Sequence, residues 1–467
     1  MESTITEQRK SFELLRAQIK GRVSLPGEPG FDEDKFSWNL VIGHAPDVIV
    51  AAQDEADVAA AVRFAAERKM PISVQSTGHG QFRVSQGGML IRTSHLKSIS
   101  IDPAARTATI GAGAVWGEVI QATAPHGLAP LSGSSPTVGV VGYLLGGGYG
   151  LLGRKYGLAI DHVKRFRVVL PDGSAVDATP TAEPELFWAL CGGGGAFGVI
   201  TEVEVALFPH SEIYGGALMF PAERAAEIYR AFAAWTAGLA NDVSPAIILI
   251  TFPPVPFVPE FLRGRSMTIV AAAMPNDEHA AEWMQPMRDL GPEFDMMGPL
   301  PYTESAKVYN DPVDPLPVHG RGVLLKEMDE AMIDALLKSI GEPAKSPNLM
   351  IQLRHLGGAI GSVEESAAAV GDRRRAKYLI YMLGIPMPHN PPEAIVGHAE
   401  GIISALAPWT LSRGPLNFAG EGNVSASVLR EVFGEKGYAR LEAVKRDFDP
   451  QNLFRNAGIG ICMSDEG

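Results

Sequence analysis

The sequence is short of cysteine and of basic charge. Its 467 residues include only two cysteines, Cys191 and Cys462, which excludes a framework of several disulfides and favours a reducing compartment. Lysine and arginine total 40 against 53 aspartate and glutamate residues, which gives a formal net charge of −13. Because nucleic-acid binding needs a basic surface, we expect no nucleic-acid partner.

Long apolar runs are also absent. No run reaches the roughly 18 apolar residues that a membrane-spanning helix needs, and the first residues, MESTITEQRK, lack the apolar core of a signal peptide. We therefore expect a cytoplasmic protein without a membrane partner. The hydrophobic content of 46% and charged content of 20% are typical of a globular chain. This length predicts two or three domains.

Two common kinds of site are missing as well. His79 is flanked by Gly78 and Gly80, but no second histidine, cysteine or carboxylate stands near it at metal-ligand spacing, so we expect no metal site. The glycine-rich segment 137–150 is not Gly-x-x-x-x-Gly-Lys-Ser/Thr, which excludes a nucleoside-triphosphatase loop. That segment follows no clear strand, which argues against a Rossmann dinucleotide loop.

What the sequence does have is dense glycine in two places. Glycine costs folding entropy, so a cluster indicates that the backbone must approach a ligand closely and present its N–H groups. The first cluster lies in segment 137–150, and the second, Gly192–Gly195, follows about 50 residues later. Two such clusters favour one extended ligand lying across several loops.

The hydrophobic pattern predicts two kinds of layer. The apolar run 48–52, a helix capped by Asp54 and the run 72–75 predict a βαβ unit. Beyond Ile213 the pattern favours an antiparallel sheet covered by helices on one side, an α+β layer. The further strands expected are 89–93, 98–101, 107–110, 166–170, 246–252, 267–274, 349–353 and 378–383, and the further helices 115–124, 222–235 and 278–290.

Four segments in this order resemble the berberine-bridge-enzyme-like FAD-linked oxidases, which have the vanillyl-alcohol-oxidase, or p-cresol-methylhydroxylase, type of FAD-binding fold. They are Gly78-His79, 135–150, 186–198 and the tail 440–456. The resemblance implies an α+β protein with a p-cresol-methylhydroxylase-type FAD-binding domain of two subdomains. Residues 1–206 and 412–467 would form that domain, and residues 207–411 an inserted substrate-binding domain of antiparallel sheet covered by helices.

The resemblance also implies how FAD is held. In the family a histidine at the position of His79 bonds covalently to the flavin 8α-methyl carbon. Some members add a second bond from a cysteine; here that position is Ser135, preceded by Ser134, which excludes a second bond. The residues that the resemblance assigns to the cofactor are Ser76, Thr77, Gly78, His79, Gly80, Gln81, Ser134, Ser135, Thr137, Gly139, Val140, Gly142, Tyr143, Gly147, Gly150, Gly198, Ile200 and Asn417.

Two residues of the glycine-rich segment bear on the chemistry. Val140 stands where family members are thought to control the access of oxygen, and a small β-branched residue there favours an oxidase. Tyr143 replaces a family histidine near the flavin ring. Tyrosine supplies no positive charge, so either Tyr143 hydrogen-bonds the flavin or contacts the substrate, or it simply packs.

The resemblance places a catalytic base on a strand after a Gly-Gly motif. Aligned in this way, Tyr378 takes the position of the base, where the plant enzymes have glutamate, and Tyr381 follows three residues later. The two face opposite sides of a strand, so at most one points into the site. Both are equally compatible with core packing. On the preceding strand Arg354 either orients an anionic or carbonyl substrate or is solvated.

Together these features predict an FAD-dependent oxidase. A small organic alcohol, amine or phenol-like substrate would give a hydride to flavin N5, and molecular oxygen would take the electrons as hydrogen peroxide. Two alternatives stay open, a flavin dehydrogenase with another acceptor and a flavin-binding protein without turnover. The sequence specifies neither the substrate nor whether the chain forms a homo-oligomer.

Overall fold

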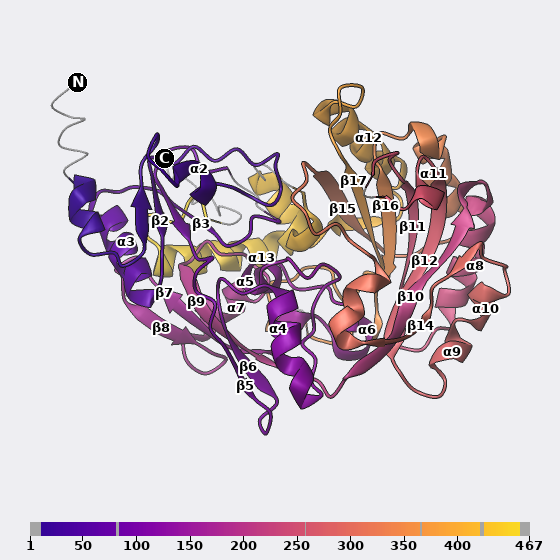
Figure 1. Cartoon of the computed structure of the whole chain (residues 1–467), viewed down its shortest axis with the longest axis horizontal. Helices are drawn as coiled ribbons and strands as arrows, with labels where there is room; N and C mark the ends of the chain where they lie inside the picture. Colours follow the sequence, from indigo (N-terminus) through magenta and orange to yellow (C-terminus); the bar gives the residue numbers. More distant parts are fainter. Residues whose placement is uncertain (1–10, 81–83, 257, 365–366, 421–424, 458–467) are drawn as a thin grey trace.

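The computed structural model describes residues 11–80, 84–256, 258–364, 367–420 and 425–457. Gln81 therefore lies outside the described residues. Figure 1 shows two lobes, with the N-terminal part of the chain and the long C-terminal helix α13 (Ala426–Phe448) in one and the middle of the chain in the other. Among the described residues, no helix has the length and apolar character to cross a bilayer, and no cluster of three potential metal ligands occurs.

The first lobe contains a four-stranded sheet and a five-stranded sheet, with helix α3 (Glu55–Glu67) in contact with both. As expected, the side chain of Asp54 caps this helix by accepting a hydrogen bond from the N–H of Asp57. The strands, in spatial order, are β1 (Arg22–Ser24), β2 (Val48–Ala51), β4 (Met89–Arg92) and β3 (Ile72–Gln75) in one sheet, and β5 (Ile99–Asp102), β6 (Thr107–Gly111), β9 (Val199–Ala206), β7 (Val163–Val169) and β8 (Ala175–Ala178) in the other.

The predicted βαβ unit is present, with one further strand between its two strands. Strands β2 and β3 are not neighbours, because β4 lies between them and pairs in parallel with both. All three strands are short apolar runs, and an apolar run does not specify which neighbour it pairs with. The predicted strands exist, but their order in the sheet was not predictable from their composition.

The second lobe is built on a nine-stranded antiparallel sheet. Helices cover one face of it (Figure 1), and the side chains on the opposite face join the core of the first lobe. Ile247 and Leu249 thus lie in the helix-covered core, whereas Ile248 between them packs toward the first lobe. The strands, along the sheet, are β13 (Phe294–Asp295), β10 (Glu212–Pro221), β12 (Ser266–Pro275), β11 (Ser244–Thr251), β16 (Met350–His355), β17 (Tyr378–Gly384), β15 (His319–Leu325) and β18 (Thr410–Arg413), with β14 (Gly298–Pro301) paired to β10.

The helices of this lobe are α8 (Ala225–Ala237), α9 (Ala280–Trp283), α10 (Gln285–Arg288), α11 (Glu330–Ile340) and α12 (Pro392–Ala405). The prediction of one helix over 278–290 is wrong, because the segment forms α9 and α10. Pro286 has no backbone N–H to donate, so a continuous helix is interrupted there. The other predicted helices, 115–124 and 222–235, correspond to α4 (Trp116–Thr123) and α8.

Buried charged side chains join the lobes. The guanidinium of Arg154, on helix α6 (Gly153–Tyr156), donates to backbone carbonyls of the second lobe, including those of Val243 and Leu356. Arg373 donates to Asp161 at 2.7 Å, and both side chains are almost fully buried. These contacts fix the face of the large sheet against the first lobe, so the space left between the lobes has a defined shape.

We propose three segments along the chain. The first boundary, after residue 206, falls at the end of β9. A boundary between 411 and 412 would fall inside β18, which pairs with β15 in the large sheet. We therefore place the second proposed boundary after Arg413, so that the sheet remains in one segment.

Candidate cofactor and substrate site

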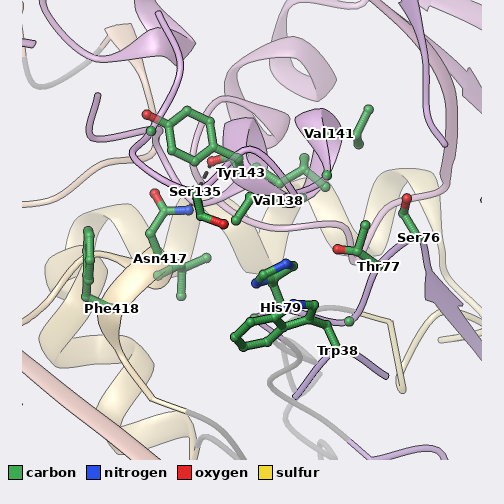
Figure 2. A pocket seen from close by; sticks show the side chains of 18 of the residues that line it. Trp38, Ser76, Thr77, His79, Ser135, Val138, Val141, Tyr143, Asn417 and Phe418 are labelled. Carbon is green, nitrogen blue, oxygen red and sulfur yellow. Dashed lines mark hydrogen bonds between the residues drawn. The ribbon is translucent and has the colours of Figure 1, made fainter. Parts of the chain in front are cut away.

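A cavity of about 390 Å³ lies between the lobes. Its walls come from the turn after β3, the glycine-rich segment 137–150, the exposed face of β16 and β17, and residues 416–418. Figure 2 shows side chains from separate segments gathered around His79, among them Trp38, Ser135 and Asn417. The structure thus brings together both glycine clusters, the Gly-His segment and the strands that were expected to bind substrate.

The glycine-rich segment forms a short helix, α5 (Val140–Leu145), instead of an open loop. A Cβ atom on Gly146 would lie 2.4 Å from the amide nitrogen of Asn417, so only glycine fits there. Asn417 in turn accepts a hydrogen bond from the N–H of Gly148 at 2.8 Å and donates to the carbonyl of Tyr143 at 3.0 Å. One side chain from the C-terminal part of the chain therefore fixes both ends of this turn.

His79 is held on two sides. Its Nε2 atom lies 2.9 Å from the Oγ1 atom of Thr137, and its ring stacks on Trp38 with centroids 4.0 Å apart. Gly78, with a φ of +79°, makes the turn that brings His79 there. Burial lowers the pKa of His79 to about 4, although a hydrogen bond with the backbone of Thr137 acts in the opposite direction. The imidazole is therefore neutral near pH 7 and keeps a nitrogen lone pair.

Most of the residues assigned to the cofactor line this cavity. They are Ser76, Thr77, Gly78, His79, Gly80, Ser134, Ser135, Gly139, Gly142, Tyr143, Gly198, Ile200 and Asn417. Thr137 lies behind His79 and also contacts the hydroxyl of Ser135 at 3.1 Å. Gly147 and Gly150 lie in the same turn but do not line the cavity.

The expected position of Val140 needs a correction. Val140 is fully buried, does not line the cavity, and donates its N–H to the carbonyl of Ala114 within the core. Helix α5 starts at Val140, and successive side chains of a helix point in different directions, so Val140 and Val141 face different sides. Val138 and Val141 are the valines that line the cavity.

Tyr143 lines the cavity with its ring and packs edge-on against Trp116, with centroids 5.4 Å apart. Its hydroxyl is buried and has no hydrogen-bond partner among the described residues. Burial raises the pKa of Tyr143, so the phenol stays protonated. A phenol with a raised pKa does not serve as a base near pH 7.

The structure separates the two tyrosines of β17. Tyr381 lines the cavity, next to Gln352 on β16 in register. Tyr378 lies on the opposite face among the helices, where its hydroxyl is 2.7 Å from that of Thr236 and its ring stacks on His355. A catalytic role for Tyr378 therefore does not fit the structure, because its hydroxyl is directed into the core and away from the cavity.

Sequence reasoning missed several contributors to the cavity, and two of them bear on its chemistry. Asp311 lines it, and its carboxylate accepts a hydrogen bond from the hydroxyl of Ser134. Trp38 forms the stacking platform under His79. Asp311 stands before a proline in a segment that reads only as a turn, and Trp38 precedes every motif, so the sequence carried no signal for either.

The residues present fit an extended flavin dinucleotide. The cavity offers glycine backbone, several hydroxyl groups and a neutral imidazole, and the hydroxyl of Ser76 is buried without a partner in the described part of the chain. Orphaned buried donors of this kind indicate a polar ligand. The remaining walls are mainly aliphatic and aromatic, as suits a planar ring system.

Comparisons with known proteins agree with this assignment. A family model described as "FAD binding domain" matches residues 46–179, and one described as "Berberine and berberine like" matches residues 426–458. (R)-6-hydroxynicotine oxidase of Paenarthrobacter nicotinovorans is 30% identical over 455 residues, which cover 94% of this chain and 96% of that protein. The chain belongs to the berberine-bridge-enzyme-like FAD-linked oxidoreductases.

Solved structures of this oxidoreductase family share the fold. The crystal structure of 6-hydroxy-D-nicotine oxidase from Arthrobacter nicotinovorans superposes with a TM-score of 0.79 at 26% identity, covering 95% of this chain and 98% of the other. BBE-like 1 of Physcomitrella patens gives a TM-score of 0.83 at 18% identity, covering 97% and 99%. The predicted α+β fold of the p-cresol-methylhydroxylase type, the FAD cofactor and the enzyme class are confirmed.

Proposed function

We propose that this FAD-linked oxidoreductase is an oxidase of small organic alcohols, amines or phenol-like compounds that returns electrons to molecular oxygen and releases hydrogen peroxide. The observation that carries the proposal is the single cavity that joins the flavin loops to the exposed face of β16 and β17. FAD, when bound, supplies the hydride acceptor, N5. The protein positions the substrate beside the flavin and supplies a group that accepts its proton.

Named relatives support the oxidase assignment. They include the hydroxynicotine oxidases, a xylooligosaccharide oxidase of Myceliophthora thermophila C1 and a chitooligosaccharide oxidase. Two valines with short side chains, Val138 and Val141, line the cavity, which favours access of oxygen to the flavin. In Phl p 4 the wild type is described as a glucose dehydrogenase and an isoleucine-to-valine variant as a glucose oxidase.

We also propose one covalent bond between His79 and the 8α-methyl carbon of the flavin. A C–H bond of that methyl group would break as the bond to nitrogen forms, its proton would go to solvent, and the two electrons released would pass through the flavin to oxygen. The bond requires a neutral imidazole nitrogen, and burial provides it by lowering the pKa of His79 to about 4. Thr137 occupies Nε2 and Trp38 fixes the plane of the ring, so Nδ1 is the nitrogen that remains for the bond. A fixed ring position costs less entropy when the bond forms.

Two cavity side chains are suited to take the proton of the substrate, Asp311 and Tyr381. We favour Asp311, because a carboxylate accepts a proton directly whereas a phenol must first lose its own. The hydroxyl of Ser134 orients this carboxylate. Tyr381, packed edge-on against Phe418 at 5.2 Å, would then orient the substrate.

The test is to reduce the holoenzyme with light under nitrogen and mix it with aerated buffer. Reoxidation within seconds, with hydrogen peroxide formed, is expected of an oxidase. Val138→Ile should slow reoxidation while leaving the reduction step unchanged. The matched control is Val396→Ile, on helix α12, at a position that does not line the cavity. Reoxidation that takes many minutes in the wild type would instead identify a dehydrogenase with another acceptor.

A further inference from the structure

Arg354 is the cationic side chain of β16 that faces the cavity. Its Nε atom donates to the side-chain oxygen of Gln352 at 2.8 Å, and one terminal nitrogen donates to the carbonyl of Tyr149 at 3.4 Å. The guanidinium lies 5.1 Å from the ring centroid of Tyr309 and 5.1 Å from that of Phe418. These contacts hold the group in place, so Arg354 is not a freely solvated side chain.

The guanidinium of Arg354 has more N–H donors than hydrogen-bond acceptors within the described residues. It has five N–H donors, and the two bonds above use two of them. Within the described residues no carboxylate lies within 4.0 Å of it, whereas Arg373 pairs with Asp161 and Arg413 with Glu400. Three N–H groups on the two terminal nitrogens therefore have no protein acceptor in this part of the chain.

A small second cavity of about 30 Å³ adjoins Arg354 on the side of His355 and Arg154. It has room for a water molecule, which would accept one N–H. That side holds no anion, because the charged neighbour is the guanidinium of Arg154. The remaining donors face the main cavity, where the carboxylate of Asp311 also lies but forms no ion pair with the guanidinium.

We propose that Arg354 binds a carboxylate of the substrate, so that the enzyme oxidises a small organic acid carrying an alcohol, amine or phenol group. This proposal rests on the proposed function and narrows its substrate class. The terminal N–H groups form the fork that matches the two oxygens of a carboxylate. Met350, Leu383 and Val138 line the same cavity, so the rest of the substrate is apolar.

The test is a binding titration of the oxidised holoenzyme that needs neither turnover nor oxygen. Benzoate and its neutral analogue benzamide are the probes, and the change in flavin absorbance reports binding. We expect the wild type to bind benzoate more tightly than benzamide by roughly tenfold to a hundredfold, the range for charge-assisted hydrogen bonds. Arg354→Met should abolish this preference while benzamide still binds as before.

Two further variants guard the interpretation. Arg354→Lys keeps the positive charge but loses the paired N–H groups of the guanidinium, so it should retain a smaller preference for benzoate. If Arg354→Met does not retain flavin, the lysine variant provides the test. Arg430→Met, at an exposed ion pair with Glu435, is the matched control and should bind both probes normally.

Three results would overturn the proposal. One is a wild type that binds the two probes equally, and another is an Arg354→Met variant that keeps the preference for benzoate. The third is an Arg354→Met variant in which the reduction potential of the flavin shifts while the ratio of benzoate to benzamide affinity stays as in the wild type. The charge of Arg354 would then act on the flavin and not on the substrate. None of these readouts depends on the reaction of reduced flavin with oxygen, so a failed oxidase assignment is recognised separately.

Discussion

The side chains of Thr137 and His79, from two different flavin loops, meet in a hydrogen bond of 2.9 Å between Oγ1 and Nε2. We expect Thr137→Val, which keeps the shape and removes the hydroxyl, to lower the fraction of flavin that stays with acid-precipitated protein. Thr137→Ser should restore it. His79→Ala should leave a colourless precipitate. A colourless wild-type precipitate would show that His79 only contacts the ring.

The two tyrosines of β17 offer a matched pair of variants. Tyr378→Phe removes a buried hydrogen bond to Thr236, so it should cost about 1 kcal/mol of stability and leave flavin reduction by substrate unchanged. Tyr381→Phe should slow flavin reduction with little change in thermal midpoint. Stopped-flow reduction and thermal melts check both expectations. If flavin reduction slows in Tyr378→Phe and not in Tyr381→Phe, Tyr378 has the catalytic role.

Asp311 is the proposed proton acceptor. Asp311→Asn keeps the size and the contact with Ser134, so the protein should fold and retain flavin. General-base catalysis is typically worth about a hundredfold to ten-thousandfold, and the rate of flavin reduction should fall by an amount in that range. If the rate changes less than about twofold, Tyr381 or the substrate itself provides the base.

Asn417 fixes the turn of the glycine-rich segment. Asn417→Leu removes both hydrogen bonds and should lower the stability of the holoenzyme by about 1–3 kcal/mol and reduce its flavin content. Asn417→Asp keeps the acceptor for Gly148 and loses the donor to Tyr143, so it should be intermediate. Asn276→Leu, which removes an exposed contact with Glu212, is the control. Equal flavin retention in all three variants would contradict this role.

His355 gives a pH dependence of stability. Burial, together with the charges of Arg154 and Lys377, lowers its pKa to about 3 in the folded protein. The unfolded chain takes up the proton below about pH 6.5, so folding loses stability as the pH falls through that value toward 3. Between about pH 7 and pH 5 the loss from this residue is about 2 kcal/mol.

His355→Phe keeps the ring against Tyr378 and cannot be protonated. The free energy of unfolding in urea should therefore change less between these pH values in the variant than in the wild type, by about the same 2 kcal/mol. An identical pH dependence in both proteins would mean that His355 titrates normally.

Local pattern was enough for the strands, because short apolar runs such as 72–75 must be buried somewhere. It was not enough for their neighbours: β4 lies between β2 and β3 although nothing in segment 89–93 marks it as the central strand. It also failed where a loop turned out to be a helix, since α5 turns Val140 into the core and leaves Val138 and Val141 at the cavity.

Most of the residues predicted to bind the cofactor line the cavity, because they lie in glycine-rich turns whose backbone approaches it closely. Strand alternation separated Tyr378 from Tyr381 but did not say which faces the ligand. Asp311 and Trp38 reach the cavity through contacts between distant segments, such as the hydrogen bond from the Trp38 indole to the carbonyl of Val313. Long-range contacts of this kind have no periodic signature.

Residues from both the N-terminal and the C-terminal half of the chain line the flavin cavity. Its glycine turn is held by Asn417, and Ala457 also lines it. A ribosome that has made the first 200 residues has therefore produced most of the loops but not the side chain that fixes them. The complete cavity therefore forms only after nearly the whole chain has been made.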